Sequence, residues 1–513
     1  MKASRRNDSR RSRFAVNDLY AEPASRVQVL LSEAVVEHQA GHLERAKVLY
    51  LQILRIDVRN EKSLFGLGVI AYQAGGFEVA EKMIRRVIAI DGKKAIYHAR
   101  LGLTLQAMKR YGEALTEFKY VLVLNPNDEE AHFNLGTLHL ELGELDKARS
   151  SFERAITRRP SYAEAHNSLG LVLQNQSRLD EAMLSYRRAL DYSPNYFKAR
   201  WNKALLELLL GNFEQGWKDY EVRHHIREVA PRSCSMPLWR GGPLSGARVL
   251  LHAEQGLGDT IQFLRYVPLV QEAGGAVLLN VPKTLFRLAE SMPGVIEVTT
   301  EDESLPSFDC HCPLMSLPLA LGTTATTIPG KVPYLGVPEE ARKKADAIPW
   351  AIGKFHVGLA WSGNPAYRLD QLRSIPFSKF EPLYSLSGLQ FFSIQVGSAA
   401  SELDSLQNPV VDLQSAIEDM GDTAALISHL DLVITVDTAV AHLAAALGKP
   451  TWVLLPFVPD WRWLIGRNDS PWYPTVRLFR QPRPRDWKAV IELVQNELAL
   501  TAGCNKETSR CGQ

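Results

Sequence analysis

The residues best suited to chemistry lie in two glycine-containing stretches of the C-terminal half. The first, "HAEQGLGDTIQF" (252–263), follows an apolar run and places Gly256 and Gly258 just before Asp259. A phosphate-binding P-loop would need a lysine that is missing, and a dinucleotide fingerprint would need a third glycine where Ile261 stands. The stretch therefore predicts a tight turn that presents the Asp259 carboxylate at a helix start, either for chemistry, as a helix cap, or for both.

The second stretch, "VITVDTAVAHLAAALGKPTWVLLPF" (433–457), predicts a strand, a turn and a short helix. Asp437 and Thr438 occupy N-cap positions, and Gly448 with Pro450 ends the helix. Amides at such a helix start can bind a diphosphate. His442 lies one turn into the helix, where it either contacts the ligand or packs in the helix interface.

Strands and helices alternate around both stretches, which is typical of parallel sheets covered on both faces. Ligands of such sheets bind beyond the carboxyl ends of the strands, where both stretches lie. The pattern predicts two Rossmann-like lobes with strands at 248–253, 276–281, 295–299, 356–361, 391–395, 410–413, 432–436 and 451–455, and helices at 260–273, 286–291, 423–429 and 439–447.

The N-terminal half repeats every 34 residues. Two positions for small residues and one for a bulky residue recur in one register, for example Gly136, Ala148 and Phe152. Three of the units end in a proline, at Pro126, Pro160 and Pro194. Small residues let two antiparallel helices approach closely, and a proline ends the second helix. The period predicts an α-solenoid of helix pairs.

Residues 29–225 resemble about six tetratricopeptide repeats, most clearly in "AHFNLGTLHLELGELDKARSSFERAITRRPSYAE" (131–164). Residues from about 247 to 500 resemble GT-B glycosyltransferases of the heptosyltransferase type, glycosyltransferase family 9. That resemblance is carried by "EQGLGDTIQFLRYVPLV", "GLAWSGNPAYRLDQLRSIP", "DTAVAHLAAALGKPTWVLL" and "PDWRWL…DSPWYPTVRLFRQ". The tandem is similar to bacterial protein O-glycosyltransferases, including those that modify flagellin.

The resemblance implies roles for single residues. Asp259 would be the catalytic base, and Arg373 in "RSIP", with Arg368 as a second candidate, would meet the donor phosphates. Ion pairs with Asp370 are the alternative for both arginines. Asp437, as helix cap or ribose ligand, would frame the nucleotide with Thr438 and His442.

Further expectations concern specificity and acceptor binding. Gln395, at a strand end, could reach the base or sugar, and Gly256 and Gly258 would leave room for substrate. Asn134 and Asn202 take the position of the peptide-binding asparagine ladder in repeats of the O-GlcNAc transferase kind, with ordinary surface polar residues as the alternative. The aromatic residues of 454–474 suit a sugar or base, or a core plug between lobes.

Composition limits the class of protein. The 513 residues carry a net charge of +2, which does not favour nucleic acid, and no run approaches the roughly 20 apolar residues of a membrane span. Five cysteines give no disulfide framework, and Cys310-His311-Cys312 lacks a second ligand pair nearby, which favours reduced thiols in a cytoplasmic protein over a metal site.

Together these observations predict a glycosyltransferase that moves a sugar from a nucleotide-sugar donor to a polypeptide acceptor held by the solenoid. No D-x-D triplet occurs, so no metal or other cofactor is required, and a single base predicts inversion. The alternative is a non-catalytic scaffold with a degenerate nucleotide-binding domain; a sugar-nucleotide epimerase ranks third. The predicted domains are a disordered basic tail (1–28), the repeats (29–225), a linker (226–246), the first lobe (247–335), a connection (336–354), the second lobe (355–500) and a polar tail (501–513).

Overall fold

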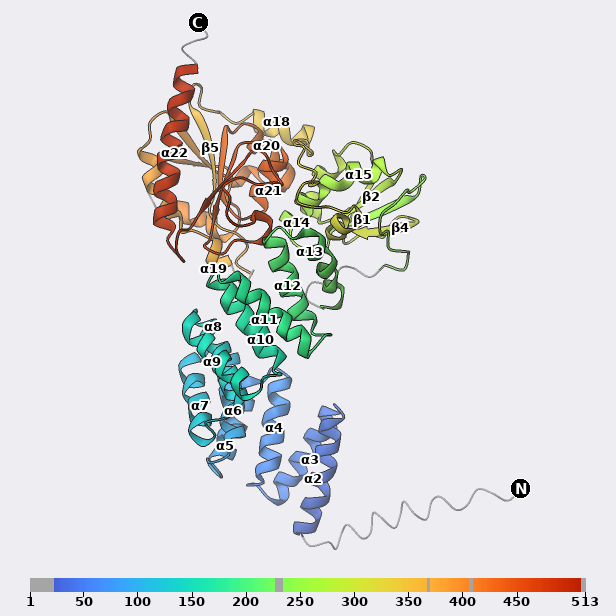
Figure 1. Ribbon diagram of the computed structural model, residues 1–513, viewed down its shortest axis with the longest axis vertical. Helices are drawn as coiled ribbons and strands as arrows, with labels where there is room; N and C mark the ends of the chain where they lie inside the picture. Colours follow the sequence, from blue (N-terminus) through green and yellow to red (C-terminus); the bar gives the residue numbers. More distant parts are fainter. Residues whose placement is uncertain (1–22, 227–233, 367–369, 406–408, 509–513) are drawn as a thin grey trace, which may run out of the picture. The chain divides into compact units, whose positions relative to one another are not determined.

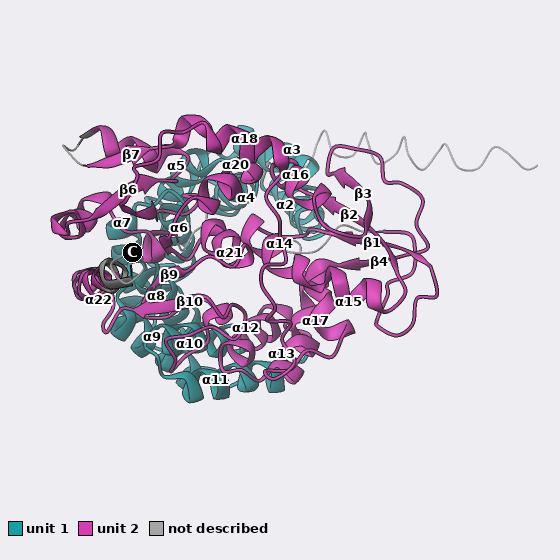
Figure 2. Cartoon of the chain, turned by 90° about the horizontal axis from the view of Figure 1, so that it is seen from above, with its two compact units in different colours: residues 1–194 teal, residues 195–513 magenta. Residues whose placement is uncertain are grey.

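The computed structural model describes residues 23–226, 234–366, 370–405 and 409–508 (Figure 1). The chain divides into two compact units, residues up to Pro194 and residues from Asn195 (Figure 2). The predicted tail at 1–28 lies outside the described residues up to residue 22, and helix α2 already begins at Pro23.

The first unit is a stack of antiparallel helix pairs, as the 34-residue period predicts (Figure 1). The two helices of each pair make extensive mutual contact. The helices are α2 (Pro23–Gln39), α3 (Leu43–Ile56), α4 (Glu61–Gln73), α5 (Phe77–Ile88), α6 (Ala95–Ala107), α7 (Tyr111–Leu124), α8 (Glu129–Glu141), α9 (Leu145–Arg158), α10 (Ala163–Asn175) and α11 (Leu179–Tyr192).

The repeat positions explain how each pair closes. A Cβ atom added to Gly136 of α8 would lie 2.6 Å from the ring of Phe152 on α9, which is fully buried. Gly102 and Gly170 meet Phe118 and Tyr186 in the same way. The small and bulky positions of the repeat are therefore two sides of one contact between the paired helices.

A sixth pair opens the second compact unit. It consists of α12 (Phe197–Leu209) and α13 (Phe213–Tyr220), followed by a 3₁₀ turn, η1 (Glu221–His225). The repeat pattern predicts a solenoid that ends near residue 225, but the last pair belongs to the compact unit of the α/β lobes.

The first lobe holds a parallel sheet with strand order β3-β2-β1-β4. Its strands are β1 (Arg248–His252), β2 (Ala276–Val281), β3 (Val295–Thr300) and β4 (Cys310–Pro313), and its α-helices are α14 (Leu257–Phe263), α15 (Val267–Glu272), α16 (Phe286–Glu290) and α17 (Leu317–Ala320). The single helix predicted at 260–273 is wrong in detail. Pro268 has no N–H to continue a helix, so a 3₁₀ turn at Leu264–Tyr266 separates α14 from α15.

The second lobe holds a six-stranded parallel sheet with order β10-β9-β8-β5-β6-β7. Val357, Ile434 and Leu454, on three adjacent strands, are fully buried in its core. The strands are β5 (Phe355–Ala360), β6 (Leu389–Ser393), β7 (Val410–Asp412), β8 (Leu432–Val436), β9 (Thr451–Leu455) and β10 (Val476–Arg480); the α-helices are α18 (Glu339–Asp346), α19 (Asp370–Arg373), α20 (Met420–Ser428), α21 (Ala439–Ala446) and α22 (Trp487–Thr508).

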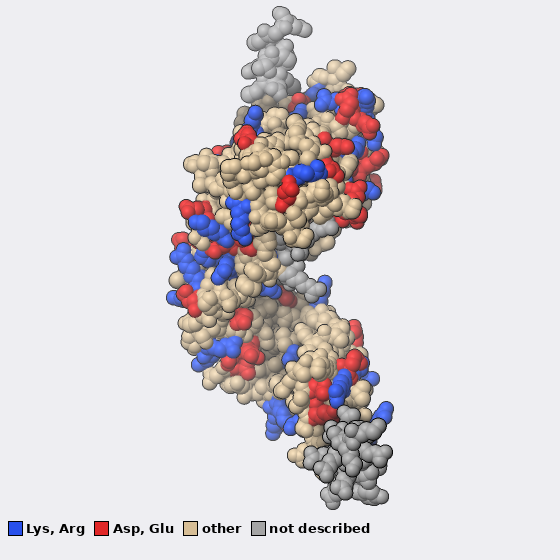
Figure 3. Space-filling view, turned by 90° about the vertical axis from the view of Figure 1, so that its right-hand side faces the viewer, with Lys and Arg blue, Asp and Glu red and all other residues tan. Residues whose placement is uncertain are grey.

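Helix α22 runs past residue 500 into the segment predicted as a polar tail. Within the described ranges, no helix combines the length and the apolar character needed to cross a membrane. Figure 3 shows Lys and Arg interspersed with Asp and Glu on the visible face, in keeping with the net charge of +2.

Candidate functional site

The two chemical stretches of the sequence meet in the structure. The loop after β1 leads into α14, the loop after β8 leads into α21, and the two helices pack against each other. A Cβ atom on Gly258 would lie 2.9 Å from Cδ2 of His442 and 3.5 Å from Cα of Ala439. The absence of a side chain at Gly258 therefore allows the two helices to approach closely, and does not leave space for a substrate.

Asp259 lies in the first turn of α14, whose N-cap residue is Gly256. Its Oδ2 accepts the backbone N–H of Gly256 at 2.8 Å, and its Oδ1 forms an ion pair with Arg462. Burial raises the pKa of the Asp259 carboxyl above its ordinary value, Arg462 opposes the shift, and the Asp460 carboxylate adds to it. The Asp259 side chain thus caps the helix and still keeps 19% of its surface accessible to a ligand.

Arg462 is the residue that sequence reasoning missed. It belongs to the 3₁₀ turn η8 (Trp461–Trp463) and is 8% exposed. Its guanidinium holds Asp460 Oδ1 at 2.7 Å in addition to Asp259, and lies 4.3 Å from the ring centroid of Trp461. An arginine inside the aromatic stretch was the available signal, because a buried cation needs a nearby carboxylate.

The loop after β8 brings a third carboxylate, that of Asp437, into the neighbourhood of Asp460 and Arg462. Thr438 is the N-cap residue of α21 but makes no side-chain cap bond; its hydroxyl lies 3.2 Å from that of Thr435. Burial and the Asp460 carboxylate together raise the pKa of Asp437 to about 6, against the opposing effects of Arg373 and Arg462. Asp437 is therefore the residue before the N-cap and not the N-cap itself, and the charges of both arginines act on its carboxylate.

His442 is buried on α21. Its Nδ1 lies 2.9 Å from the Tyr473 hydroxyl, and its ring stacks on Trp463 with centroids 5.3 Å apart. Burial lowers the pKa of His442 well below its ordinary value, and the surrounding arginines, Arg462 foremost, lower it further. The imidazole is therefore neutral at pH 7 and offers a ligand no positive charge.

Arg373, at the end of α19, forms the ion pair with Asp370 that the sequence offered as the alternative, with Nε 3.0 Å from Oδ1. The other Asp370 oxygen accepts the Ser374 hydroxyl at 2.8 Å. The charge of Arg373 nevertheless lowers the pKa of Asp259, Asp437 and His442, so the guanidinium lies in the vicinity of these three residues. Arg368 lies outside the described residues.

Gln395 makes backbone contacts. Its Oε1 accepts the N–H groups of Trp361 and Ser362 at 3.0 and 2.9 Å, and its Nε2 donates to the Val396 carbonyl at 2.9 Å. The side chain thus shapes the loop after β5, and contact with a base or sugar stays a prediction.

The aromatic residues of 454–474 form the core plug rather than an open platform. Trp461, Trp463, Trp472 and Tyr473 are all buried. Trp217 of α13 packs edge-on to Trp461 and Trp472, with centroids 5.3 and 6.4 Å apart. The last helix pair is therefore part of the hydrophobic contact that holds the site.

A buried ion pair strengthens this connection. Arg223 of η1 binds Glu254, in the loop after β1, through two bonds of 2.9 and 3.0 Å, and both side chains are fully buried. Arg223 also donates to the Ser316 hydroxyl at 2.6 Å, and Glu254 accepts the Met315 N–H at 3.0 Å. These bonds fix the loop two residues before Gly256.

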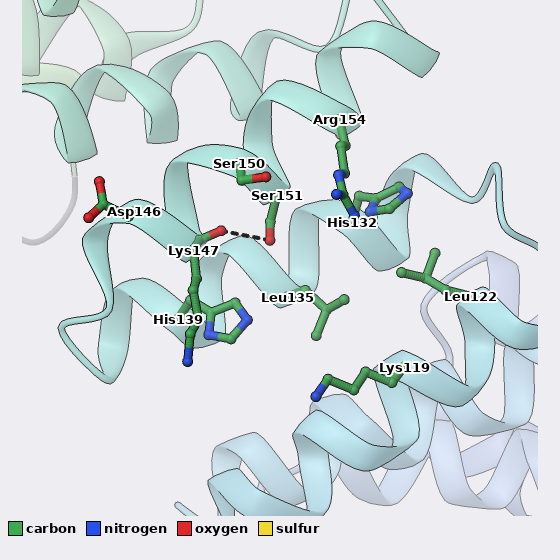
Figure 4. A pocket seen from close by; sticks show the side chains of 10 residues that line it. All are labelled: Lys119, Leu122, His132, Leu135, His139, Asp146, Lys147, Ser150, Ser151 and Arg154. Carbon is green, nitrogen blue, oxygen red and sulfur yellow. Dashed lines mark hydrogen bonds between the residues drawn. The ribbon is translucent and has the colours of Figure 1, made fainter.

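In the first compact unit, a pocket of about 430 Å³ lies among α7, α8 and α9 (Figure 4). Three basic side chains line it, Lys119, Lys147 and Arg154, against one acidic side chain, Asp146. Asn134, on α8, does not line this pocket, and Asn202 lies on α12 in the other unit. The asparagine ladder stays a prediction.

With the geometry described, the class of protein follows. Residues 99–163, 133–196 and 167–216 match the tetratricopeptide repeat, and residues 402–454 match glycosyltransferase family 9 (heptosyltransferase). The chain thus joins a tetratricopeptide-repeat solenoid to an α/β region with two parallel sheets, and residues 402–454 of that region match the glycosyltransferase family 9 model.

Among individual proteins, the chain is similar to Protein FlbA of Caulobacter vibrioides, with 29% identity over 329 residues that cover 58% of this chain and 54% of the relative. The chain therefore spans about half the length of that relative. Solved structures with similar repeats include YrrB, a TPR protein with an unusual peptide-binding site (24% identity, TM-score 0.29, 33% of this chain and 88% of the other), and TTC0263, a thermophilic TPR protein of Thermus thermophilus (23%, 0.32, 36% and 99%).

Proposed function

We propose that this protein is a GT-B glycosyltransferase that moves a sugar from a nucleotide-sugar donor to a Ser or Thr hydroxyl of a protein acceptor held by the solenoid. The observation that carries the proposal is the convergence of Asp259, Arg462 and Arg373 with the loop after β8, in a chain with a family 9 segment. Flagellin or another surface protein is the acceptor class that the sequence resemblance favours, and the cytoplasm is the location that five cysteines without a disulfide framework favour.

In this mechanism the Asp259 carboxylate takes the proton of the acceptor hydroxyl. The hydroxyl oxygen attacks the anomeric carbon as the bond from that carbon to the diphosphate oxygen breaks, so the configuration inverts. Burial supports Asp259 in this role, because a raised pKa makes a carboxylate a stronger base. Arg373 and Arg462 stabilise the charge that develops on the leaving diphosphate, and no metal is required.

Charge in the first unit supports a peptide acceptor. The pocket of Lys119, Lys147 and Arg154 would favour acceptor segments with acidic residues, through contacts whose strength falls with salt.

The test is Asp259→Asn in the full chain, with transfer measured by acceptor mass and nucleotide affinity by calorimetry. Transfer should fall by about 10³-fold, within the range of a lost general base, while nucleotide binding persists. Asp460→Asn, which removes the other carboxylate on Arg462, is the matched control and should cost less than tenfold. Full activity of Asp259→Asn would remove the base from this mechanism, and a wild-type chain that binds no nucleotide would favour the scaffold.

A further inference from the structure

A second cluster of reactive side chains lies on β1 and β4, at one edge of the first lobe's sheet. His252 is the last residue of β1, and His311 lies on the neighbouring strand β4. Strand pairing sets Leu250 opposite His311, so His252 and His311 share one face of the sheet. Their rings stack with centroids 5.3 Å apart and are 1% and 8% exposed.

The segment before β1 brings a cysteine to the two histidines. Trp239 donates its N–H to the His311 carbonyl at 2.8 Å, and the His311 N–H donates to the Pro237 carbonyl at 3.0 Å. This pairing places half-buried Cys234 beside the imidazoles, and one ligand atom from each of the three residues lies within 4.8 Å of the others.

The spacing of these atoms is close to that of a metal site. His252 Nε2 and His311 Nδ1 are 3.1 Å apart. Two imidazole nitrogens on one tetrahedral zinc ion would be about 3.3 Å apart, and a nitrogen and a thiolate sulfur about 3.6 Å apart. The separation of the two nitrogens therefore needs to change by only about 0.2 Å, and that of sulfur and nitrogen by at most about 1.2 Å.

We propose that Cys234, His252 and His311 bind one Zn²⁺ ion, with water in the fourth position. The donor set of one thiolate and two imidazoles suits zinc, whereas Mg²⁺ and Ca²⁺ prefer oxygen ligands. Binding releases the Cys234 thiol proton. The imidazole that donates in the His252–His311 hydrogen bond shifts its proton to its other ring nitrogen, which frees both facing lone pairs for the metal.

The ion would tie the segment at 234–239 to β1 and β4. His252 stands two residues before Glu254, which is bonded to Arg223, so the metal and this ion pair would hold the same loop from two sides. We assign the ion a structural role and no step in sugar transfer. The site uses His311 of the Cys310-His311-Cys312 stretch with ligands from elsewhere in the chain.

The experiment uses the purified full chain stripped of metal and titrated with Zn²⁺, and separately with Co²⁺ as a spectroscopic probe. Wild type should bind one equivalent, show a thiolate-to-cobalt absorption band and gain thermal stability with Zn²⁺. Cys234→Ser should lose the band and bind Zn²⁺ at least tenfold more weakly, and His311→Gln should weaken binding similarly. Cys310→Ser is the matched control, because Cys310 alternates with His311 and faces the other side of the sheet.

Metal-free melting temperatures separate folding from binding. Cys234→Ser and Cys310→Ser should melt like wild type without metal, and Zn²⁺ should raise the melting temperature of Cys310→Ser only. A wild-type chain that retains no zinc would overturn the proposal and leave a hydrogen-bonded histidine pair. Equal Zn²⁺ affinity in wild type and Cys234→Ser would overturn it as well.

Discussion

Glycines make close contacts in both the solenoid and the lobes, but over very different spans of sequence. In the solenoid, Gly136 meets Phe152, sixteen residues later, and the same pair recurs at the same spacing in other repeats. In the lobes, Gly258 meets His442, and Asp259 pairs with Arg462, 203 residues away. Because the contacts of the solenoid are local and repeated, a single substitution there should disturb one helix pair only. The site depends on contacts that occur once, so a single substitution can disrupt it.

The largest effect is expected where the contact spans both lobes. Arg462→Leu leaves the carboxylates of Asp259 and Asp460 without their cation and should cost about 3 kcal/mol of unfolding free energy, measured by urea denaturation. Because Arg462 lowers the pKa of Asp259, the acid limb of the transfer rate should move to higher pH in Arg462→Lys if the shorter cation reaches Asp259 less well. Adding Asp259→Asn to Arg462→Leu should restore part of the stability; strictly additive losses would contradict the pairing.

The ionisation of Asp437 should make a pH-dependent contribution of up to about 3 kcal/mol to the free energy of unfolding. This is 1.36 kcal/mol for each pKa unit between its ordinary value and about 6. A raised pKa in the folded state means that the protonated form stabilises the fold. This contribution is complete below about pH 4 and is lost as the pH rises through 6. Asp437→Asn should therefore exceed wild type in stability at pH 7.5 and match it at pH 4; a constant difference across that range would contradict the shift.

A change within one repeat should be smaller and local. Gly136→Ala forces a methyl group against the buried Phe152 ring and should cost about 1–3 kcal/mol, with faster amide exchange in α8 and α9. Gly112→Ala, on α7, meets nothing within 4 Å and should stabilise the chain by about 0.5–1 kcal/mol. If the two variants behaved alike, the glycine–aromatic contact would not control the packing of the pair.

The smallest effect is expected at the pocket of α7–α9. Lys147→Glu should raise the KM for a protein acceptor several-fold and leave kcat and the donor KM unchanged, because the change alters only long-range charge. Initial rates at low and high salt provide the check, because the difference in acceptor KM between Lys147→Glu and wild type should shrink as the salt concentration rises. A drop in kcat would show instead that the pocket acts on the chemical step.

The same comparison explains what the sequence could predict. The solenoid follows from one period, and the strands at Ala276–Val281, Leu432–Val436 and Thr451–Leu455 follow from continuous apolar runs. Neither β4 nor β10 was among the predicted strands. β4 is hard to predict because Cys310–Pro313 is short and ends in proline, whereas the alternation of residue types in Val476–Arg480 offered a signal for β10.

The site was only partly predictable. Residue types at strand ends selected Asp259, Asp437 and His442, and the structure brings them together. The partner of Asp259 and the tight fit at Gly258 depend on how two lobes pack, which no local pattern records. The neutral state of His442 likewise comes from burial by distant aromatic side chains.

The positions of Trp217 and Arg223 have a consequence for exchanging parts between related proteins. A hybrid joined at residue 226, where the repeat pattern ends, would pair the lobes with a foreign helix and strip Trp461, Trp472 and Glu254 of their partners. A junction between Pro194 and Asn195 keeps α12 and α13 with the lobes. The interchangeable module is therefore five helix pairs long, and the sixth pair stays with the lobes.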